Sequence, residues 1–422
     1  MSTAVTKEIA ACRICGNPGL EVVLDLGTQF LTGVFPKSPS ENVLEGPLQL
    51  VKCVEGGPHH CGLLQLKHSY ALDQMYGDNY GYRSGLNASM VKHLGRIVDG
   101  NMERTRPKSG DVFVDVGSND ATLLKSYPKD RYRLIGIDPT ARKFKEFYSD
   151  DIEVIPDFFT ASALLSVLGS ERVKVLTSIA MFYDLESPLD FVRDVAAVLA
   201  DDGIWVFEQS YMPAMIERTS YDTVCHEHLE FYALKQIKWM LDRADLKIIE
   251  LMFTETNGGS ILVTAAKNGS PFAECKEQTA EILDKEKAAG YGTLKPFKKF
   301  ASDVEKHAND LKELLIELQK KNKKVLGYGA STKGNVVLQY AGITPQVLPG
   351  IVEVNEEKFG AYTPGSHIPI LSEKDADAIN PDYYLVLPWH FRESIMQRET
   401  AFLKRGGKFI FPLPSIQIVD IP

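Results

Sequence analysis

The chain has 422 residues and a formal net charge of −9; 44% of its residues are hydrophobic and 24% are charged. This length predicts about two or three domains, each large enough for its own core. The acidic balance argues against nucleic acid as a partner, because phosphate contacts need clustered lysine and arginine. We find no apolar run of the length of a signal peptide or a membrane span, so we expect a cytoplasmic protein with no membrane partner.

Four cysteines near the start of the chain have the spacing of a metal site. They are Cys12 and Cys15, in a Cys-x-x-Cys loop, and the wider pair Cys53 and Cys61. Four thiolates from two loops suit a tetrahedral structural zinc ion. Either His59 or His60 could replace Cys61 as the fourth ligand, and free cysteines in a reduced protein are the alternative reading. We predict a small β-rich zinc-binding domain over residues 1–72.

Strands and helices alternate through the middle of the chain, residues 73–270. Apolar residues at helical spacing predict a first helix over 86–104. Strands are predicted at 112–116, 133–137, 174–179 and 203–208, with helices at 119–126, 140–147, 160–168 and 188–199. A hairpin within 247–266 would complete the sheet. Strict alternation implies a mostly parallel sheet covered on both faces, in a Rossmann-like α/β domain.

The turn after the strand at 112–116 has the character of a nucleoside pocket. Gly117, Ser118 and Asn119 follow Asp115, and a second strand ends in Asp138, whose carboxylate could accept both hydroxyls of a ribose. The turn lacks the further glycines of G-x-G-x-x-G, and the carboxylates of Asp115 and Asp120 flank it. A pyrophosphate would be repelled there, so the pattern favours the sulfonium S-adenosylmethionine over NAD. The alternative is an ordinary βαβ turn with no ligand.

The segment after the next strand faces the same cleft. Ala180 and Met181 follow the strand at 174–179, where this fold lines the adenine and substrate sides of the cofactor site, and Tyr183 lies beside them. Tyr80 and Tyr82 belong to a glycine-rich loop before the first helix and could reach a neighbouring pocket. Packing is the alternative role for each of these side chains.

A second α/β pattern occupies residues 271–422. A long polar helical stretch at 276–320 precedes a strand, a glycine-rich turn and a helix at 335–341, and strands at 349–354, 383–387 and 408–411 follow. The turn carries Ser331, Thr332 and Lys333 and no carboxylate, which is typical of an anion site such as one for a diphosphate. A tight turn with an exposed lysine is the alternative. We expect a second Rossmann-like domain and a ligand between the two halves.

The densest polar cluster follows the fourth strand of the first sheet. His226, Glu227 and His228 do not form HExxH, and histidines two apart do not share a helix face, so zinc-protease chemistry is unlikely. A histidine beside a carboxylate suits proton abstraction, with Glu227 orienting the imidazole. The alternative is a loop whose histidines have no catalytic role.

Several motifs in a fixed order resemble one enzyme family. They are Cys12-x-x-Cys15-Gly16 with Cys53 and Cys61-Gly62-Leu63, Tyr82-Arg83-Ser84, Asp115-Val116-Gly117-Ser118-Asn119-Asp120, Glu227-His228-Leu229, Asn257-Gly258-Gly259-Ser260, the run from Gly327 to Asn335, and Tyr362-Thr363-Pro364-Gly365-Ser366-His367. Together they resemble the deoxysugar C-methyltransferases, S-adenosylmethionine enzymes acting on nucleotide-linked keto-sugars. The resemblance covers nearly the whole chain.

The resemblance implies three domains, a mechanism and a set of site residues. A base removes the proton next to the sugar ketone, and the enolate carbon, expected to be C-3 of a 4-keto-deoxysugar on dTDP or a similar nucleotide, attacks the sulfonium methyl group. His228 would be the base, with Glu227 beside it and Tyr82 near the sugar. The substrate would contact Tyr80, Tyr183, Asn257, Ser331, Thr332, Lys333, Asn335 and His367. The alternatives are an O- or N-methyltransferase on a small acceptor and a non-catalytic nucleotide-binding protein.

Overall fold

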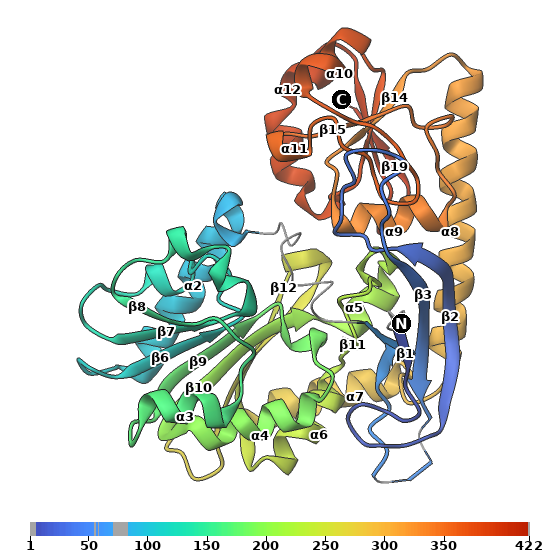
Figure 1. Ribbon diagram of the computed structural model, residues 1–422. Helices are drawn as coiled ribbons and strands as arrows, with labels where there is room; N and C mark the ends of the chain where they lie inside the picture. The colour runs from blue at the N-terminus through green and yellow to red at the C-terminus, as the bar shows by residue number, and fades with distance from the viewer. Residues whose placement is uncertain (1–5, 55, 58, 71–82, 421–422) are drawn as a thin grey trace.

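The structure is a computed structural model that describes residues 6–54, 56–57, 59–70 and 83–420. Tyr80 and Tyr82 therefore lie outside the described residues. The described residues form two large sheets, each with strands in parallel, and two smaller antiparallel sheets near the N-terminus (Figure 1). The predicted α/β class, with two Rossmann-like units and a small N-terminal β unit, is confirmed.

The N-terminal residues form a four-stranded antiparallel sheet in the order β11-β4-β3-β2. Its strands are β2 (Leu20–Phe30), β3 (Glu45–Cys53), β4 (Leu64–Leu66) and β11 (Glu230–Phe231). Beside it, β1 (Thr6–Glu8) pairs with β5 (His68–Tyr70). The strand β11 comes from the middle of the chain, directly after His228. The N-terminal sheet is thus completed by the segment that carries the predicted base.

The central sheet has seven strands in the order β12-β13-β10-β9-β6-β7-β8. The parallel strands are β6 (Val112–Val116), β7 (Arg133–Ile137), β8 (Ile152–Ile155), β9 (Val173–Ile179) and β10 (Leu199–Ser210), and the hairpin is β12 (Leu246–Thr254) with β13 (Ser260–Lys267). The hairpin joins the sheet through antiparallel pairing of β13 with β10, as predicted.

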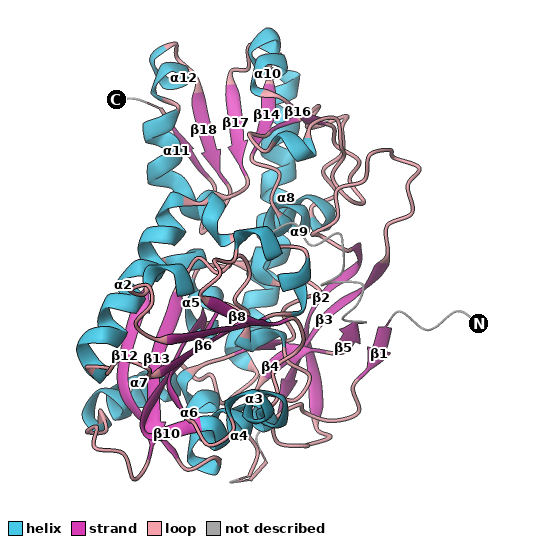
Figure 2. Ribbon diagram, turned by 60° about the vertical axis from the view of Figure 1, so that its left-hand side comes forward, coloured by secondary structure: helices cyan, strands magenta, loops and turns pink. Residues whose placement is uncertain are grey.

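Helices cover both faces of the central sheet (Figure 2). Because side chains alternate along a strand, Phe113 packs with Leu94 and Val98 of α2 on one face, while Val112 and Val114 meet the helices of the other face. The helices are α2 (Ala88–Thr105) on the first face and α3 (Ala161–Leu168), α4 (Pro188–Val198) and α6 (Leu234–Arg243) on the second, with the short α5 (Met212–Glu217) after β10.

Two of the predicted helices are wrong. Residues 119–126 form turns and a single 3-10 turn at Leu124–Ser126, and residues 140–147 form 3-10 turns at Pro139–Arg142 and Lys145–Phe147. Asn119 (φ 51°) and Ala121 (φ 60°) adopt left-handed backbone conformations, which a right-handed helix excludes.

The second large sheet has the order β16-β15-β14-β17-β18-β19. Its strands are β14 (Val325–Tyr328), β15 (Ile351–Val352), β16 (Ile370–Leu371), β17 (Tyr383–Val386), β18 (Lys408–Phe411) and β19 (Gln417–Val419), and β19 alone is antiparallel to its neighbour. Its helices are α9 (Thr332–Tyr340), α10 (Glu373–Ile379), α11 (Arg392–Arg398) and α12 (Thr400–Lys404).

A long helix joins the N-terminal and C-terminal sheets. The predicted helical stretch at 276–320 is divided into α7 (Lys276–Ala288) and α8 (Lys295–Lys320). One buried apolar cluster contains Leu50 of β3, Val304 of α8 and Leu326 of β14. Figure 1 shows α8 running alongside β2 up to the C-terminal sheet. These three parts therefore share one core, and burial of that shared surface holds them together.

Candidate active site

Both large sheets place polar turns at the point where their strand order reverses. In the central sheet the reversal lies between β6 and β9, and in the C-terminal sheet between β14 and β17. Ligands of α/β proteins bind outside the carboxyl ends of the strands at such points. Gly117 follows β6 and Met181 follows β9, and a Cβ added to Gly117 would lie 3.0 Å from Met181 Cγ. The structure thus brings these two predicted cofactor residues together.

The turn after β6 combines buried carboxylates with an irregular backbone. Thr177 Oγ1 donates to Asp115 Oδ1 at 2.5 Å, and burial raises the pKa of Asp115 to about 7. Gly117 (φ 75°) and Asn119 (φ 51°) carry the chain through left-handed conformations, and Ala180 (φ 54°) does so on the facing turn. Such conformations outside glycine are concentrated at functional sites.

Asp138 organises the turn as well as ending β7. Its Oδ2 accepts the backbone N–H of Asn119 at 2.8 Å, and its Oδ1 accepts the N–H and hydroxyl of Thr140, both at 2.6 Å. Ser118 Oγ lies 2.7 Å from the Tyr148 hydroxyl, which donates to the Asn119 carbonyl at 2.9 Å. The three occupied positions leave about one lone pair of the Asp138 carboxylate for a ribose hydroxyl.

Asp120, in the turn after β6, contacts the segment that begins at Arg83. Its Oδ2 accepts the N–H of Gly85 at 3.0 Å and lies 3.6 Å from Arg83 Nε. Asn119 Oδ1 accepts the N–H of Ser84 at 3.0 Å. The segment that begins at Arg83 is therefore bonded directly to this turn.

His228 lies between the central sheet and the C-terminal domain. Its Nδ1–H donates to the Thr223 carbonyl at 2.8 Å, and the Tyr183 ring packs on the imidazole with centroids 4.3 Å apart. Burial and then the nearby charge of Lys333 lower the pKa of His228 to about 4. The imidazole is thus neutral near pH 7, with Nε2 as its basic nitrogen.

The expected role of Glu227 as the group that orients this imidazole is wrong. His228 Nδ1 contacts Thr223, its carbonyl at 2.8 Å and its hydroxyl at 3.4 Å, and Glu227 Oε2 has no hydrogen-bond partner among the described residues. A Cβ added to Gly33 would lie 3.3 Å from Glu227 Oε1 and 4.0 Å from Thr332 Oγ1. Glu227 Oε1 and Thr332 Oγ1 therefore both lie beside Gly33, and burial raises the pKa of Glu227. Glu227 lies in a turn that is closed by the bond from the His228 N–H to the Cys225 carbonyl at 3.2 Å.

Lys333 reaches from the second glycine-rich turn toward His228. Its Nζ donates to the Asn257 carbonyl at 3.0 Å, so two predicted substrate residues meet. Asp222 is 2% exposed; Trp389 Nε1–H donates to its Oδ2 at 2.8 Å, while its Oδ1 has no partner among the described residues. Burial raises the pKa of Asp222, and the charge of Lys333 opposes that shift.

Asp222, Trp389 and His390 lie at the site although the sequence did not predict them as site residues. Burial, followed by the charge of Lys333, lowers the pKa of His390 to about 3. Trp389 and His390 follow β17, at the point where the strand order of the C-terminal sheet reverses. Ligand-binding residues are common at such strand ends, so this position in the sequence could have marked them as candidates. A strand end opposite a glycine-rich turn could have indicated both.

The remaining predicted substrate residues have different surroundings. Ser331 is the N-cap of α9, and its Oγ accepts the N–H of Gly334 at 3.0 Å. Asn335 is fully buried and donates to the Thr32 carbonyl at 2.8 Å, which connects α9 to the N-terminal part. His367 is exposed in a turn, where its N–H donates to the Thr363 carbonyl. Within the part of the chain that the structure describes, His367 makes no hydrogen bond or ring contact with His228 or Lys333.

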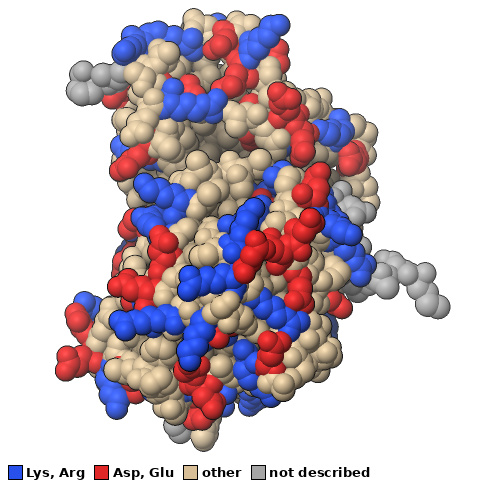
Figure 3. Space-filling view, turned by 90° about the vertical axis from the view of Figure 1, so that its left-hand side faces the viewer, with Lys and Arg blue, Asp and Glu red and all other residues tan. Residues whose placement is uncertain are grey.

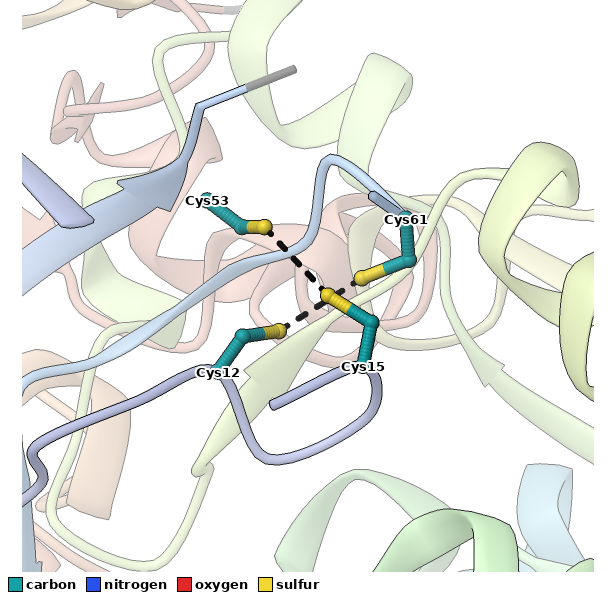
Figure 4. Close-up of side chains that lie close together, drawn as sticks. All are labelled: Cys12, Cys15, Cys53 and Cys61. Atoms are coloured by element: carbon teal, nitrogen blue, oxygen red, sulfur yellow. Dashed lines mark hydrogen bonds between the residues drawn. The ribbon is translucent and has the colours of Figure 1, made fainter. Parts of the chain in front are cut away.

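The four cysteines form one compact cluster (Figure 4). All four sulfurs lie within 4.8 Å of one another, with 3.5 Å between Cys12 and Cys61 and 3.6 Å between Cys15 and Cys53. Zn–S bonds of about 2.3 Å in a tetrahedron place sulfurs a little under 4 Å apart, so the donor set fits this ion. His59 is exposed, and His60 Nδ1 accepts the N–H of Gly56 at 3.0 Å. Among the described residues the cluster thus contains Cys61 and neither histidine.

Charges of both signs are interspersed on the surface drawn in Figure 3. Within the ranges that the structure describes, no helix is long and apolar enough to cross a membrane.

Three family models match successive parts of the chain. They are described as "Putative zinc binding domain" for residues 12–76, "Methyltransferase domain" for residues 90–251 and "C-methyltransferase C-terminal domain" for residues 255–414. The C-methyltransferase NovU of Streptomyces niveus is 29% identical over 99% of this chain and 98% of its own.

Solved structures match a smaller part. The N-methyltransferase NodS of Bradyrhizobium japonicum WM9 is 12% identical, with a TM-score of 0.30 over 42% of this chain and 94% of its own. The CurJ carbon methyltransferase is 13% identical, with a TM-score of 0.33 over 43% of this chain and 55% of its own.

The family models and the sheet order define the class of the protein, an S-adenosylmethionine-dependent methyltransferase. The C-terminal model and the full-length relative narrow the class further, to an S-adenosylmethionine-dependent C-methyltransferase. Methyl transfer to oxygen or nitrogen and a non-catalytic role, the two alternatives from the sequence, are thereby set aside.

Proposed function

We propose that the enzyme methylates C-3 of a nucleotide-linked 4-keto-deoxysugar through an enolate, with His228 as the base. The observation that carries this proposal is the state of the imidazole. Its Nδ1–H is bonded to the Thr223 carbonyl and its pKa is lowered to about 4, so Nε2 is free to accept a proton at neutral pH. Transfer to carbon requires such a base, because a carbon acid must lose its proton to become nucleophilic.

S-adenosylmethionine, when bound, supplies an electrophilic methyl group on a sulfonium. In the proposed site Asp138 and the Gly117 turn hold its nucleoside, and Ala180 and Met181 border it. Burial raises the pKa of Tyr148, and the nearby charges of Asp138, Asp115 and Asp120 add to that shift. This concentration of carboxylates supports a cationic ligand.

The sugar nucleotide would lie across the two domains. In this proposal Lys333, with the turn at Ser331 and Thr332, holds the diphosphate, while Tyr183 and Asn257 border the sugar. The nucleotide and keto-sugar follow from the sequence resemblance. The position of Lys333 near His228 supports them, since an ammonium group close to the proposed base could bind an anionic substrate.

The cysteine cluster is proposed to bind a structural zinc ion. The sulfur spacing and the family model support this. Metal content can be measured on the purified protein, with Cys15→Ser as the variant expected to lose it.

The test of the proposed function uses S-adenosylmethionine with a panel of nucleotide-linked 4-keto-sugars. We expect a mass gain of one methyl in place of one hydrogen, and exchange of solvent deuterium into the sugar without cofactor. His228→Asn should lower both rates by about 10²–10⁴-fold, whereas the neighbouring His226→Gln should retain them. Full turnover by His228→Asn would refute the assignment of the base.

A further inference from the structure

A buried arginine lies inside the Cys-x-x-Cys loop. The Arg13 side chain is 2% exposed. Its guanidinium donates to the Leu66 carbonyl at 2.6 Å, the His68 carbonyl at 3.2 Å and Ser69 Oγ at 3.0 Å. A guanidinium is costly to bury unless its donors are satisfied and its charge is compensated. The three acceptors belong to β4 and β5, so one side of Arg13 is anchored in the N-terminal part.

The other side of Arg13 faces the methyltransferase domain. Its Nε lies 3.7 Å from Glu230 Oε1 and 3.6 Å from Glu186 Oε2. The Glu230 side chain is fully buried, and neither of its oxygens has a hydrogen-bond partner among the described residues. Burial raises the pKa of Glu230, and the nearby charge of Arg13 opposes that shift. Arg13 is thus the cation that faces Glu230, which lies two residues after His228.

The backbone around His228 is held by the same two parts. The Leu66 N–H donates to the Leu229 carbonyl at 2.8 Å, and the Leu229 N–H donates to the Tyr183 carbonyl at 2.8 Å. From Glu230 the chain continues as β11, antiparallel to β4, with Glu230 opposite Gln65. Gln65 Oε1 in turn accepts the backbone N–H of Arg13 at 3.1 Å. Figure 1 shows β11 beside the N-terminal strands.

We propose that Arg13 is a positioning residue for His228: it fixes β11, through Glu230 and the edge of β4, so that the imidazole stays on Tyr183 and Thr223. The inference rests on the proposed function only for the consequence of that placement, the loss of base catalysis. It assigns to the cysteine-rich domain a part in shaping the catalytic site as well as in folding.

The test compares Arg13→Gln, Arg13→Lys and Glu230→Gln. Two readouts are needed: the imidazole NMR signals of His228, assigned by their loss in His228→Asn, and the kinetic constants with S-adenosylmethionine. Arg13→Gln should displace the His228 signals and lower kcat by about 10–100-fold, because small misplacements of a reacting group cost this much, with KM for S-adenosylmethionine unchanged. Arg13→Lys, a point charge without the planar fork, should recover part of the loss.

Glu230→Gln keeps the volume of the side chain and removes the carboxyl group that faces Arg13. If Arg13 acts through Glu230, the double variant should lose no more than the worse single variant. The matched control is Arg193→Gln, which removes a surface arginine paired with Asp190 and should change neither readout. Zinc content is measured for every variant, because Arg13 lies between two cysteines.

Unchanged His228 signals and kcat in Arg13→Gln would overturn the inference, as would a loss of kcat that follows zinc content alone. If Arg13→Gln does not fold, Arg13→Lys and Glu230→Gln decide by the same readouts. Failure of the proposed function is separately visible: His228→Asn would then retain turnover, while the NMR displacement would still report on positioning.

Discussion

His226 and His228, two residues apart, should make separable contributions to stability and catalysis. His226 is fully buried against the N-terminal sheet, with its Nε2 3.4 Å from the Gly46 carbonyl and its ring edge-on to Tyr70 at 4.7 Å. Burial lowers the pKa of His226 to about 4. We predict that His226→Gln makes the fold less sensitive to acid and leaves the base in place.

The direction of the change in folding stability with pH follows from proton linkage. The unfolded chain binds a proton on His226 below its ordinary pKa of 6.5, whereas the folded protein does not do so until about 4. The stability that neutral His226 contributes is therefore present above pH 6.5 and is lost as the pH falls toward 4. Between about pH 7 and about pH 5 the loss amounts to about 2 kcal/mol.

The assay is urea denaturation of wild type and His226→Gln at both pH values, with the methyl-transfer rate measured in parallel. The change in unfolding free energy on acidification should be about 2 kcal/mol smaller in the variant. Other buried histidines and the cysteine cluster are present in both proteins, so their contributions cancel in the difference. Equal acid sensitivity would refute the argument, and so would loss of methyl transfer in His226→Gln while His228→Asn stays active.

Three further predictions concern other parts of the molecule. Lys333→Met should raise the pKa of His228, because the Lys333 charge helps to lower it, and should raise KM for the sugar nucleotide. The acidic limb of the pH profile of deuterium exchange should therefore move to higher pH, and an unmoved limb would contradict this. Cys15→Ser should lower zinc content and the midpoint of thermal unfolding together, since metal binding is linked to folding, and a stable variant without zinc would show that the cluster is not a structural metal site. Leu48→Ala, at a fully buried position of β3, should cost about 2–5 kcal/mol in urea unfolding, and a smaller loss would indicate that the site collapses around the cavity.

Most strands of the two large sheets could be predicted from the sequence, because a parallel strand buried on both faces is a continuous apolar run. The strands β8, β16 and β19, which lie at the edges of the sheets, were not predicted. The conformation of the segments after Gly117 and Asp138, where helices were predicted, could not be predicted from the sequence. There the backbone is determined by bonds such as that from the Asn119 N–H to Asp138 Oδ2, which lies 19 residues further on. No local pattern of apolar residues records such a bond. The sequence therefore indicated the position of the cofactor turn better than its conformation.

In the candidate site, too, the sequence predicted the residues better than the contacts between them. The sequence singled out Lys333, Asn257 and Tyr183, and the structure brings Lys333 to Asn257 and Tyr183 to His228. It could not assign the partner of His228, since Thr223 contributes a backbone carbonyl, which every residue has. Nor could it pair Asp222 with Trp389 across 167 residues. Contacts between domains depend on how whole sheets pack, and a single sequence does not encode them locally.

The depressed pKa of His228 creates a conflict that the proposed substrate resolves. A base must be unprotonated at working pH, and a pKa of about 4 ensures this, but the same low pKa makes it a weak acceptor for the proton of a carbon acid. Burial and the Lys333 charge are its causes, in that order. A diphosphate paired with Lys333 would offset the second cause and strengthen the base only when the sugar nucleotide is present. Placing the anion site beside the base would thus couple substrate binding to proton abstraction.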